Sequence, residues 1–277
     1  MSLQTTPQTP RARAGLRAVL DSPADALIAC DFDGTLSPIV DDPEAAYAEP
    51  GATEALSRLS AHVGTVAILT GRPVAAVRRL AGLDELTGTA ELEVLGQYGV
   101  ERWDAATGQV LAPQAPATVA RAREALPRLL ASLGVDDAHL EDKGRAIGVH
   151  VRRAADPEGT YARLREPLET FAGEHGLHLE PGKLVLELRA PGTDKGGALR
   201  ELVDERGARA VVYAGDDLGD LAAYDAVEDM RAKGMPGLLV YSLGAERTAL
   251  ADHADILLDG PPGLVAWLTE LADRLDD

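Results

Sequence analysis

The apolar residues in the first hundred positions fall into short continuous runs separated by amphipathic segments. The runs cover residues 26–30, 65–69 and 92–95, and turn-forming or polar residues follow each one. The segments that open at Pro50 and Pro73 carry leucine or valine at the three- and four-residue spacing of a helix face. Continuous apolar strands that alternate with helices predict a parallel sheet with right-handed crossovers.

The pattern changes between residues 109 and 190. Residues 109–111 look like the return strand of a hairpin from residues 101–103. Two successive units of helix, strand and strand follow, and apolar and polar residues alternate in the strands at 146–152 and 184–189. Alternation with a period of two predicts an antiparallel sheet with one face in water. We therefore expect a small α+β domain inserted into a larger one.

The parallel pattern returns after the insert. Apolar runs at residues 210–214, 237–241 and 255–258 predict three more strands, and a C-terminal helix follows the last of them. The predicted fold class is therefore α/β, with a core built on a Rossmann-like parallel sheet.

The same patterns predict where the domains begin and end. The core comprises residues 11–108 and 191–277, and the inserted α+β domain comprises residues 109–190. Residues 1–10 are polar and rich in proline and threonine, which predicts a disordered tail.

Composition narrows the choice of partners and compartment. The 277 residues carry a formal charge of -18, which argues against nucleic acid or an anionic membrane as a partner. No stretch approaches the roughly 20 apolar residues of a membrane span, and the N-terminal residues lack the apolar core of a signal peptide. The single cysteine, Cys30, is expected to be a buried strand residue rather than a nucleophile. We expect a cytoplasmic protein, with a monomer favoured over an oligomer.

Polar side chains follow three of the predicted strands. In chain order they are Asp31, Asp33, Thr70, Asp216, Asp217 and Asp220. Because the carboxyl ends of parallel strands lie at one edge of a sheet, we expect these groups to converge. Carboxylates held close together repel one another, and a hard cation with oxygen ligands, such as Mg²⁺, relieves the repulsion.

Lys195 begins the helix that follows the insert, where its ammonium group can hold an anion or neutralise a carboxylate. Two carboxylates, a hydroxyl, a lysine and a divalent metal ion make a phosphoryl-transfer set. One carboxylate attacks phosphorus, another exchanges protons, and the cations offset the charge of the phosphate oxygens. Two simpler interpretations also apply: Thr70 caps the helix that opens at Pro73, and Asp217 and Asp220 are turn residues.

Four short motifs stand in a fixed order along the chain. They are DFDGTL at residues 31–36, LTGR at 69–72, TDKG at 193–196 and GDDLGD at 215–220. As an ordered set they resemble the four motifs of the haloacid dehalogenase (HAD) superfamily, and the insert is similar to the C2B cap of that superfamily. The resemblance implies a HAD-like Rossmannoid core with an inserted α+β cap domain.

The resemblance also implies a role for each motif residue that acts on phosphate. Asp31 matches the nucleophile that forms an aspartyl-phosphate. Asp33 matches the general acid and base. Thr70 and Lys195 match the hydroxyl and the lysine that stabilise the phosphate.

The last motif supplies the metal site that the resemblance implies. Asp216 matches the metal-binding aspartate, which shares a Mg²⁺ ion with a carboxylate oxygen of Asp31 and the backbone carbonyl of Asp33. Asp217 and Asp220 match supporting groups.

Longer stretches are similar to the trehalose-6-phosphate phosphatases, a family within this superfamily. They lie at residues 70–73, 96–101, 141–144, 149–152 and 182–189. The likeness implies substrate-binding roles for Gly71, Arg72, Gln97, Tyr98, Glu101, Lys143, His150, Lys183, Glu187 and Arg189. In one departure, the last motif of that family often reads GDDxTDE, whereas Leu221 stands here in place of the final acidic residue.

The candidate residues of the insert have two interpretations. Lys183 and Glu187 are four positions apart, so in one strand their side chains face the same side and can bind several sugar hydroxyls. The simpler interpretation is that Lys143, Lys183, Glu187 and Arg189 are solvated strand charges and that His150 packs on the sheet.

The expected function is hydrolysis of trehalose 6-phosphate by a Mg²⁺-dependent phosphatase. Another C2B-capped phosphatase, acting on sucrose 6-phosphate or mannosyl-3-phosphoglycerate, is the nearest alternative. A sugar phosphomutase and a non-catalytic sensor of sugar phosphates belong to different functional classes. In each case the partner is a small sugar phosphate.

Overall fold

The structure is a computed structural model that describes residues 5–86, 91–182, 184–192, 194–244 and 249–276. The chain forms two compact units. The first comprises Met1–Ala112 together with Thr193–Asp277, and the second comprises Pro113–Gly192. The second unit is thus inserted into the first along the chain.

The first unit is built on an eight-stranded sheet with the order β12-β11-β10-β1-β2-β3-β4-β5. Its strands are β1 (Ala26–Cys30), β2 (Thr65–Leu69), β3 (Leu92–Gly96), β4 (Glu101–Asp104), β5 (Val110–Leu111), β10 (Ala210–Gly215), β11 (Gly237–Ser242) and β12 (Ile256–Leu258). The strands from β12 to β3 are parallel, and β4 and β5 add an antiparallel hairpin at one edge. The predicted parallel core is confirmed.

The first strand lies in the middle of the sheet, between β2 and β10. The chain runs from β1 to β2 and β3 on one side, and after the insertion it continues through β10, β11 and β12 on the other. The direction of winding therefore reverses between β1 and β10. In α/β sheets ligands bind outside the carboxyl ends of the strands at such a switch point.

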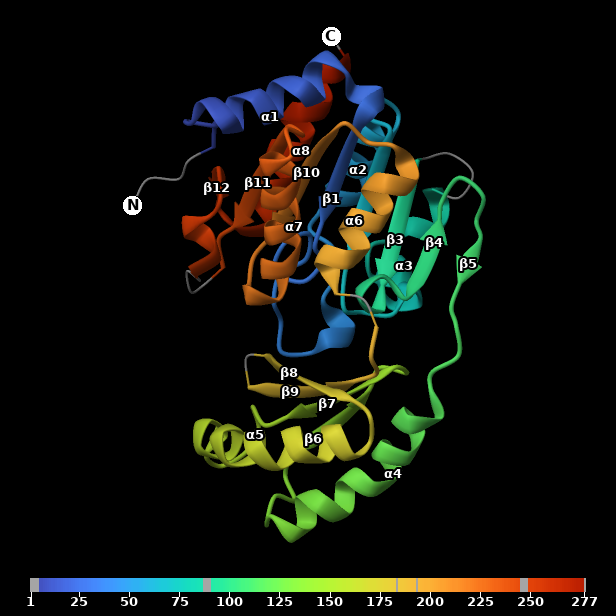
Figure 1. The fold of residues 1–277 in the computed structure, drawn as a ribbon, viewed down its shortest axis with the longest axis vertical. Coiled ribbons are helices and arrows are strands. Elements are labelled where there is room, and N and C mark those ends of the chain that lie inside the picture. Colours follow the sequence, from blue (N-terminus) through green and yellow to red (C-terminus); the bar gives the residue numbers. More distant parts are fainter. Residues whose placement is uncertain (1–4, 87–90, 183, 193, 245–248, 277) are drawn as a thin grey trace. The chain divides into compact units, whose positions relative to one another are not determined.

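Helices cover both faces of this sheet (Figure 1). They are α1 (Pro10–Asp21), α2 (Ala52–Ser60), α3 (Val74–Leu80) and α8 (Gly260–Asp276) on one face, and α6 (Lys195–Arg206) and α7 (Leu221–Ala232) on the other. Side chains of β1 alternate between the two layers: Ile28 and Cys30 pack with the first group, whereas Leu27 and Ala29 pack with the second. Apolar side chains on both faces explain why the β1 sequence is a continuous apolar run.

The second unit has a four-stranded antiparallel sheet with the order β6-β7-β9-β8. Its elements are α4 (Ala117–Ser132), β6 (His139–Asp142), β7 (Ala146–His150), α5 (Pro157–Glu174), β8 (His178–Gly182) and β9 (Val185–Arg189). Both helices pack on one face of the sheet through an apolar core that includes Leu126, Val149, Leu164 and Leu188. The predicted repeat of helix, strand and strand is present.

The boundaries of the units differ slightly from those expected. The first segment of the core reaches Ala112 rather than residue 108, because β5 pairs with β4 through Trp103 and Val110. The core resumes at Thr193 rather than residue 191.

The N-terminal part of the core is longer than expected. Helix α1 begins at Pro10, and the side chain of Thr9 accepts a hydrogen bond from the backbone N–H of Ala12. A capped helix start shortens the predicted tail of residues 1–10, of which residues 1–4 lie outside the described part of the chain.

Helix α7 is an element that the apolar pattern did not predict, and it follows directly after the GDDLGD turn.

Over the residues that the structure describes, no helix combines the length and the apolar character that a membrane span requires.

Candidate active site

The carboxyl end of β1 leads into a tight turn that carries Asp31 and Asp33. The backbone N–H of Asp31 still donates to Ala214 of β10, at 2.8 Å, so the parallel pairing continues up to the first aspartate. Gly34 has a φ of +77°, and a Cβ placed there would lie 2.0 Å from Oδ2 of Asp216. Only glycine lets this turn approach Asp216 so closely.

Cys30 is buried one residue before this turn. Burial, with the nearby charge of Asp31 as a second cause, raises the pKa of its thiol to about 12. A thiol with this pKa is protonated at neutral pH and is a poor nucleophile. Its environment therefore agrees with a buried strand residue.

Lys195 joins the first and last motifs inside the core. Its Nζ lies 2.7 Å from Oδ1 of Asp31 and 2.7 Å from Oδ1 of Asp220. The side chains of Lys195 and Asp31 are each 7% exposed, and that of Asp220 is fully buried. Burial acts to lower the pKa of Lys195, but Asp220 and Asp31 together raise it well above its ordinary value, so the ammonium group is charged.

Asp220 is the centre of a buried hydrogen-bond network. Its Oδ1 accepts from Lys195 and from the hydroxyl of Tyr213, each at 2.7 Å. Its Oδ2 accepts from the backbone N–H groups of Asp216 and Asp217, at 3.0 and 3.4 Å. A carboxylate has about four acceptor positions, and these four donors use them. Asp220 therefore positions Lys195 and the turn, rather than offering an oxygen to a metal ion.

Tyr213 is a residue that sequence reasoning missed. It is fully buried in β10, where the other residues of the run are apolar. A buried hydroxyl in an apolar strand requires a partner, and this requirement is the signal that could have marked it.

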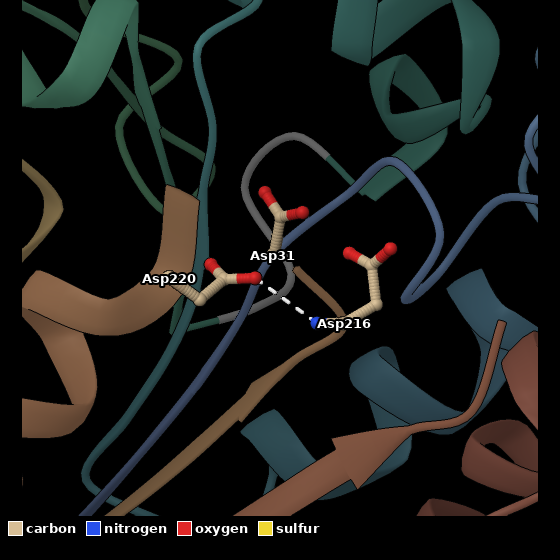
Figure 2. A group of neighbouring side chains, drawn as sticks. All are labelled: Asp31, Asp216 and Asp220. Atoms are coloured by element: carbon tan, nitrogen blue, oxygen red, sulfur yellow. Dashed lines mark hydrogen bonds between the residues drawn. The ribbon is translucent and has the colours of Figure 1, made fainter. Parts of the chain in front are cut away.

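Asp31, Asp216 and Asp220 gather at the switch point between β1 and β10 (Figure 2). One oxygen from each lies within 4.8 Å of the others. Burial, followed by the charges of Asp31 and Asp220, raises the pKa of Asp216 to about 9. Burial also raises the pKa of Asp31 well above its ordinary value, against the lowering effect of Lys195.

The cluster therefore suits a hard divalent cation. The Asp31 carboxylate already pairs with the ammonium group of Lys195, and a divalent cation would offset the remaining negative charge of the neighbouring Asp216. Since the oxygens of Asp220 are used by four donors, the carboxylates of Asp31 and Asp216 are the groups that fit such an ion.

Asp33 lies beside this cluster and is paired with Arg72. The Nε of Arg72 donates to Oδ2 of Asp33 and its Nη2 donates to Oδ1, both at 2.7 Å. The third nitrogen, Nη1, donates to the carbonyl of Pro43 at 2.8 Å. Arg72, expected to bind substrate, thus engages the carboxylate expected to exchange protons.

Thr70 follows β2 and organises the loop that carries Arg72. It is buried, its Oγ1 accepts from the backbone N–H of Arg72 at 3.1 Å, and its carbonyl accepts from Tyr98 at 2.9 Å. Gly71 packs against Tyr98, since a Cβ at this glycine would lie 2.8 Å from the phenol ring. Gln97 and Tyr98 adopt positive φ values of 50° and 59°, which are uncommon for residues with side chains.

The alternative role of Thr70 as a helix cap is wrong. The N-cap of α3 is Pro73, without a capping side-chain bond, whereas the backbone N–H of Val74 donates to Oε2 of Glu101 at 2.8 Å. Glu101, expected to bind substrate, therefore satisfies the first turn of α3. Its side chain has a structural task inside the core.

Asp217 builds the turn after β10. Its Oδ1 accepts from the backbone N–H of Gly219 at 2.8 Å, and it shares a capping box with Asp220 at the start of the short helix η5 (Leu218–Asp220). This geometry agrees with its interpretation as a turn residue.

One face of the sheet in the second unit is polar, and we call Glu141, Lys143, His150, Glu187 and Arg189 its polar face. Lys143 pairs with Glu187 and lies 3.9 Å from Glu141. Nε2 of His150 lies 2.7 Å from Oε2 of Glu141.

Gly148 makes room for these contacts. It pairs with Glu141 of β6 on one side and Glu187 of β9 on the other. A Cβ there would lie 2.9 Å from Nε2 of His150. Glu141 was missed as a candidate, although its spacing of two from Lys143 places both on one face of the strand.

Arg189 and Lys183 are the remaining candidates of the second unit. Nε of Arg189 lies 3.4 Å from Oε2 of Glu180 on the neighbouring strand. Lys183 lies outside the described residues.

Solved structures of other proteins define the class of this fold. A haloacid dehalogenase-like hydrolase from Bacteroides thetaiotaomicron matches with a TM-score of 0.63 at 15% identity, covering 88% of this chain and 98% of that one. The C-terminal domain of C. albicans trehalose-6-phosphate phosphatase matches with a TM-score of 0.75 at 22% identity, covering 98% and 99%. Their fold is that of the HAD-like hydrolases, which confirms the predicted fold class.

Sequence comparison then identifies the family. The profile of the trehalose-phosphatase family matches residues 29–249. The trehalose-phosphate phosphatase of Mycobacterium avium (strain 104) is 34% identical over 255 residues, which are 89% of this chain and 62% of that protein. The chain belongs to the trehalose-phosphatase family, and it spans less than two thirds of the length of this relative.

Proposed function

We propose that the chain is a Mg²⁺-dependent phosphatase that hydrolyses trehalose 6-phosphate to trehalose and phosphate. The observation that carries the proposal is the buried carboxylate of Asp31, held by Lys195 at the switch point of the sheet beside Asp216. The trehalose-phosphatase family and the name of the Mycobacterium avium relative support the choice of substrate.

The first chemical step transfers the phosphoryl group to the protein. An oxygen of Asp31 attacks phosphorus, and the bond between phosphorus and the C6 oxygen of the sugar breaks. Asp33 gives its proton to that oxygen, so trehalose leaves as an alcohol. Lys195 offsets the negative charge of the phosphate oxygens. Thr70 Oγ1 accepts from a backbone N–H, which leaves its own hydroxyl proton to donate to the phosphate.

The second step releases phosphate and restores the protein. Asp33, now a carboxylate, takes a proton from a water molecule as that water attacks phosphorus. The bond between phosphorus and Asp31 breaks, and the aspartate leaves as a carboxylate. Both protonation states are then those of the start.

The metal ion that this chemistry requires fits the aspartate cluster. We assign its ligands to a carboxylate oxygen of Asp31, the backbone carbonyl of Asp33 and the carboxylate of Asp216. When bound, Mg²⁺ supplies charge compensation and polarises a phosphate oxygen. Asp220 remains with Lys195 and Tyr213 as a positioning group.

The sugar is recognised by other groups. We assign its hydroxyls to the polar face of the second unit, with Lys183 as a further contributor, because paired carboxylate and ammonium groups bind several hydroxyls at once. We place Gln97 and Tyr98 near the phosphate end because they lie beside Thr70. The protein acts in the cytoplasm, and a monomer suffices for this scheme.

The test is phosphate release in Mg²⁺ from a panel of trehalose 6-phosphate, sucrose 6-phosphate and mannosyl-3-phosphoglycerate, with Asp31→Asn as the blank. We expect fastest turnover of trehalose 6-phosphate and none in the blank. Preference for another member of the panel would reassign the substrate. An isomeric sugar phosphate without free phosphate would indicate a mutase, and binding without any turnover would indicate a sensor.

A further inference from the structure

All three nitrogens of the Arg72 guanidinium donate hydrogen bonds inside the first unit. Two nitrogens hold the two oxygens of Asp33 at 2.7 Å each, and the third holds the carbonyl of Pro43 at 2.8 Å. The Arg72 side chain is 15% exposed and that of Asp33 is 32% exposed. Arg72 is therefore the better buried partner of the pair, and it holds the more exposed carboxylate of Asp33.

The backbone of Arg72 is held as firmly as its side chain. Its N–H donates to Oγ1 of Thr70 at 3.1 Å, and its carbonyl accepts from Gln97 at 2.9 Å. Its guanidinium carbon also lies 5.9 Å from the centre of the Phe32 ring, within the range of a cation–π contact. Arg72 is thus presented to Asp33 by a loop that is fixed at several points.

A bidentate arginine fixes the plane and the position of a carboxylate, because two parallel N–H···O bonds leave the group no rotation. Each carboxylate oxygen has two acceptor positions, and the arginine uses one on each. Both oxygens of Asp33 therefore keep a position at which a proton can be exchanged. Without the arginine, the side chain of Asp33 could turn about its own bonds toward solvent.

We propose that Arg72 is a positioning residue that holds the proton-exchanging carboxylate of Asp33 in place, and not a ligand of the sugar. The inference rests on the proposed function, since it needs Asp33 to protonate the leaving oxygen. The two-point contact of Arg72 sets the orientation of the Asp33 carboxylate, and a single positive charge at the same place does not replace that contact.

Two substrates whose leaving groups differ in basicity distinguish a positioning role of Arg72 from a role in binding phosphate or sugar. Trehalose leaves as an alkoxide unless a proton is delivered, whereas p-nitrophenolate is stable enough to leave without one. The measurement is the rate of leaving-group release in a single turnover with excess enzyme and Mg²⁺, for trehalose 6-phosphate and for p-nitrophenyl phosphate. A single turnover isolates the first step from the later hydrolysis of the aspartyl-phosphate.

The variants are Arg72→Gln, Arg72→Lys and Asp33→Asn, with Arg79→Gln as the matched control. Arg79 lies on helix α3, which follows the loop that carries Arg72; it pairs with Glu44 and donates to the carbonyl of Glu44 at 3.3 Å. It therefore anchors the same short segment, η2 (Pro43–Ala45), that Arg72 anchors through Pro43, but it has no recorded bond to Asp33 among the described residues.

We expect Arg72→Gln to slow trehalose release by about 100-fold, the scale of a misplaced general acid, and p-nitrophenolate release by no more than about threefold. Asp33→Asn should show the same selectivity in a larger degree, and Arg79→Gln should match the wild type on both substrates. Arg72→Lys should resemble Arg72→Gln, because a lysine cannot hold both oxygens.

Three results would overturn the inference. Equal losses on both substrates would make Arg72 a phosphate ligand or a purely structural residue. A rise in KM for trehalose 6-phosphate with kcat unchanged would make it a sugar ligand. Full rescue by Arg72→Lys would make charge, and not two-point geometry, the cause.

The same data distinguish a failure of the proposed function from a failure of this inference. If the wild type releases p-nitrophenolate but not trehalose, the substrate assignment is wrong. The comparison then uses whichever primary sugar phosphate the wild type turns over fastest, and the selectivity between leaving groups still decides the role of Arg72.

Discussion

Asp220→Asn tests the most buried part of the site with a change of one atom. The carboxylate of Asp220 accepts from two donors on each oxygen, whereas an asparagine has one accepting oxygen and one donating NH₂ group. If the amide oxygen faces Lys195 and Tyr213, the NH₂ group meets the backbone N–H groups of Asp216 and Asp217. The two backbone N–H donors then face the NH₂ group, which is itself a donor, and no acceptor is left for them.

The loss in the free energy of unfolding can be estimated from these contacts. An unsatisfied buried donor costs about 1–3 kcal/mol, and the longer 3.4 Å bond of Asp217 contributes less than the 3.0 Å bond of Asp216. Lys195 exchanges a charged acceptor for a neutral one, a further loss of about 1 kcal/mol. Removing the charge also relieves repulsion on Asp31 and Asp216, which returns about 1 kcal/mol. We expect a net loss of about 2–3 kcal/mol.

Urea unfolding followed by tryptophan fluorescence measures this loss. The two tryptophans, Trp103 and Trp267, both lie in the first unit, so the signal reports the unit that contains Asp220. EDTA is included so that bound metal adds nothing to the stability of either protein.

Asp217→Asn is the matched control. It removes the same formal charge from the same turn, and its recorded side-chain bonds in the described structure, to the N–H of Gly219 and, within the capping box, to the backbone N–H of Asp220, are ones that the oxygen of an asparagine accepts equally well. We expect a change within about 0.5 kcal/mol. If Asp220→Asn is no more destabilising than Asp217→Asn, the network argument is refuted.

Three further outcomes follow from the geometry. Gly34→Ala, with a Cβ 2.0 Å from Asp216 and a φ of +77°, should weaken Mg²⁺ activation at least tenfold, and an unchanged Mg²⁺ dependence would contradict it. Gly148→Ala should raise KM for trehalose 6-phosphate several-fold but leave p-nitrophenyl phosphate kinetics unchanged; equal effects would remove the polar face from sugar binding. Burial, with Asp31 and Asp220, raises the pKa of Asp216 from 3.8 to about 9, so the metal-free native state binds more protons than the unfolded state between these values. Its stability in EDTA should therefore fall as pH rises from 5 to 8, and Mg²⁺ should reverse the trend; rising stability in EDTA would refute this.

The positions of the predicted strands and most of the core candidates followed from local pattern. The apolar runs of β1, β2 and β10 are buried on both faces, and a strand buried on both faces must be continuously apolar. Since such strands are parallel in this class of fold, the polar residues at their carboxyl ends had to share an edge. Asp31, Thr70 and Asp216 could be placed on that basis.

The partners of individual side chains did not follow from local pattern. Arg72 stood beside Thr70 and Gly71 in the sequence, but its bidentate partner is Asp33, 39 positions away. Glu101 reaches back 27 positions to the first turn of α3. A one-dimensional pattern reports how a residue is buried and with what period, but not which distant segment approaches it.

The sequence alone determined the strands, the inserted unit and the set of chemical groups at one edge of the sheet, because these depend on burial and on the order of motifs along the chain. Only the tertiary structure decided the strand order, with its reversal between β1 and β10, and the division of work within the aspartate cluster. Asp216 keeps an oxygen suited to a cation, whereas the four donors around Asp220 use its acceptor positions. One of those donors, Lys195, reaches Asp220 from 25 positions away, because α6 packs beside η5 in the folded protein.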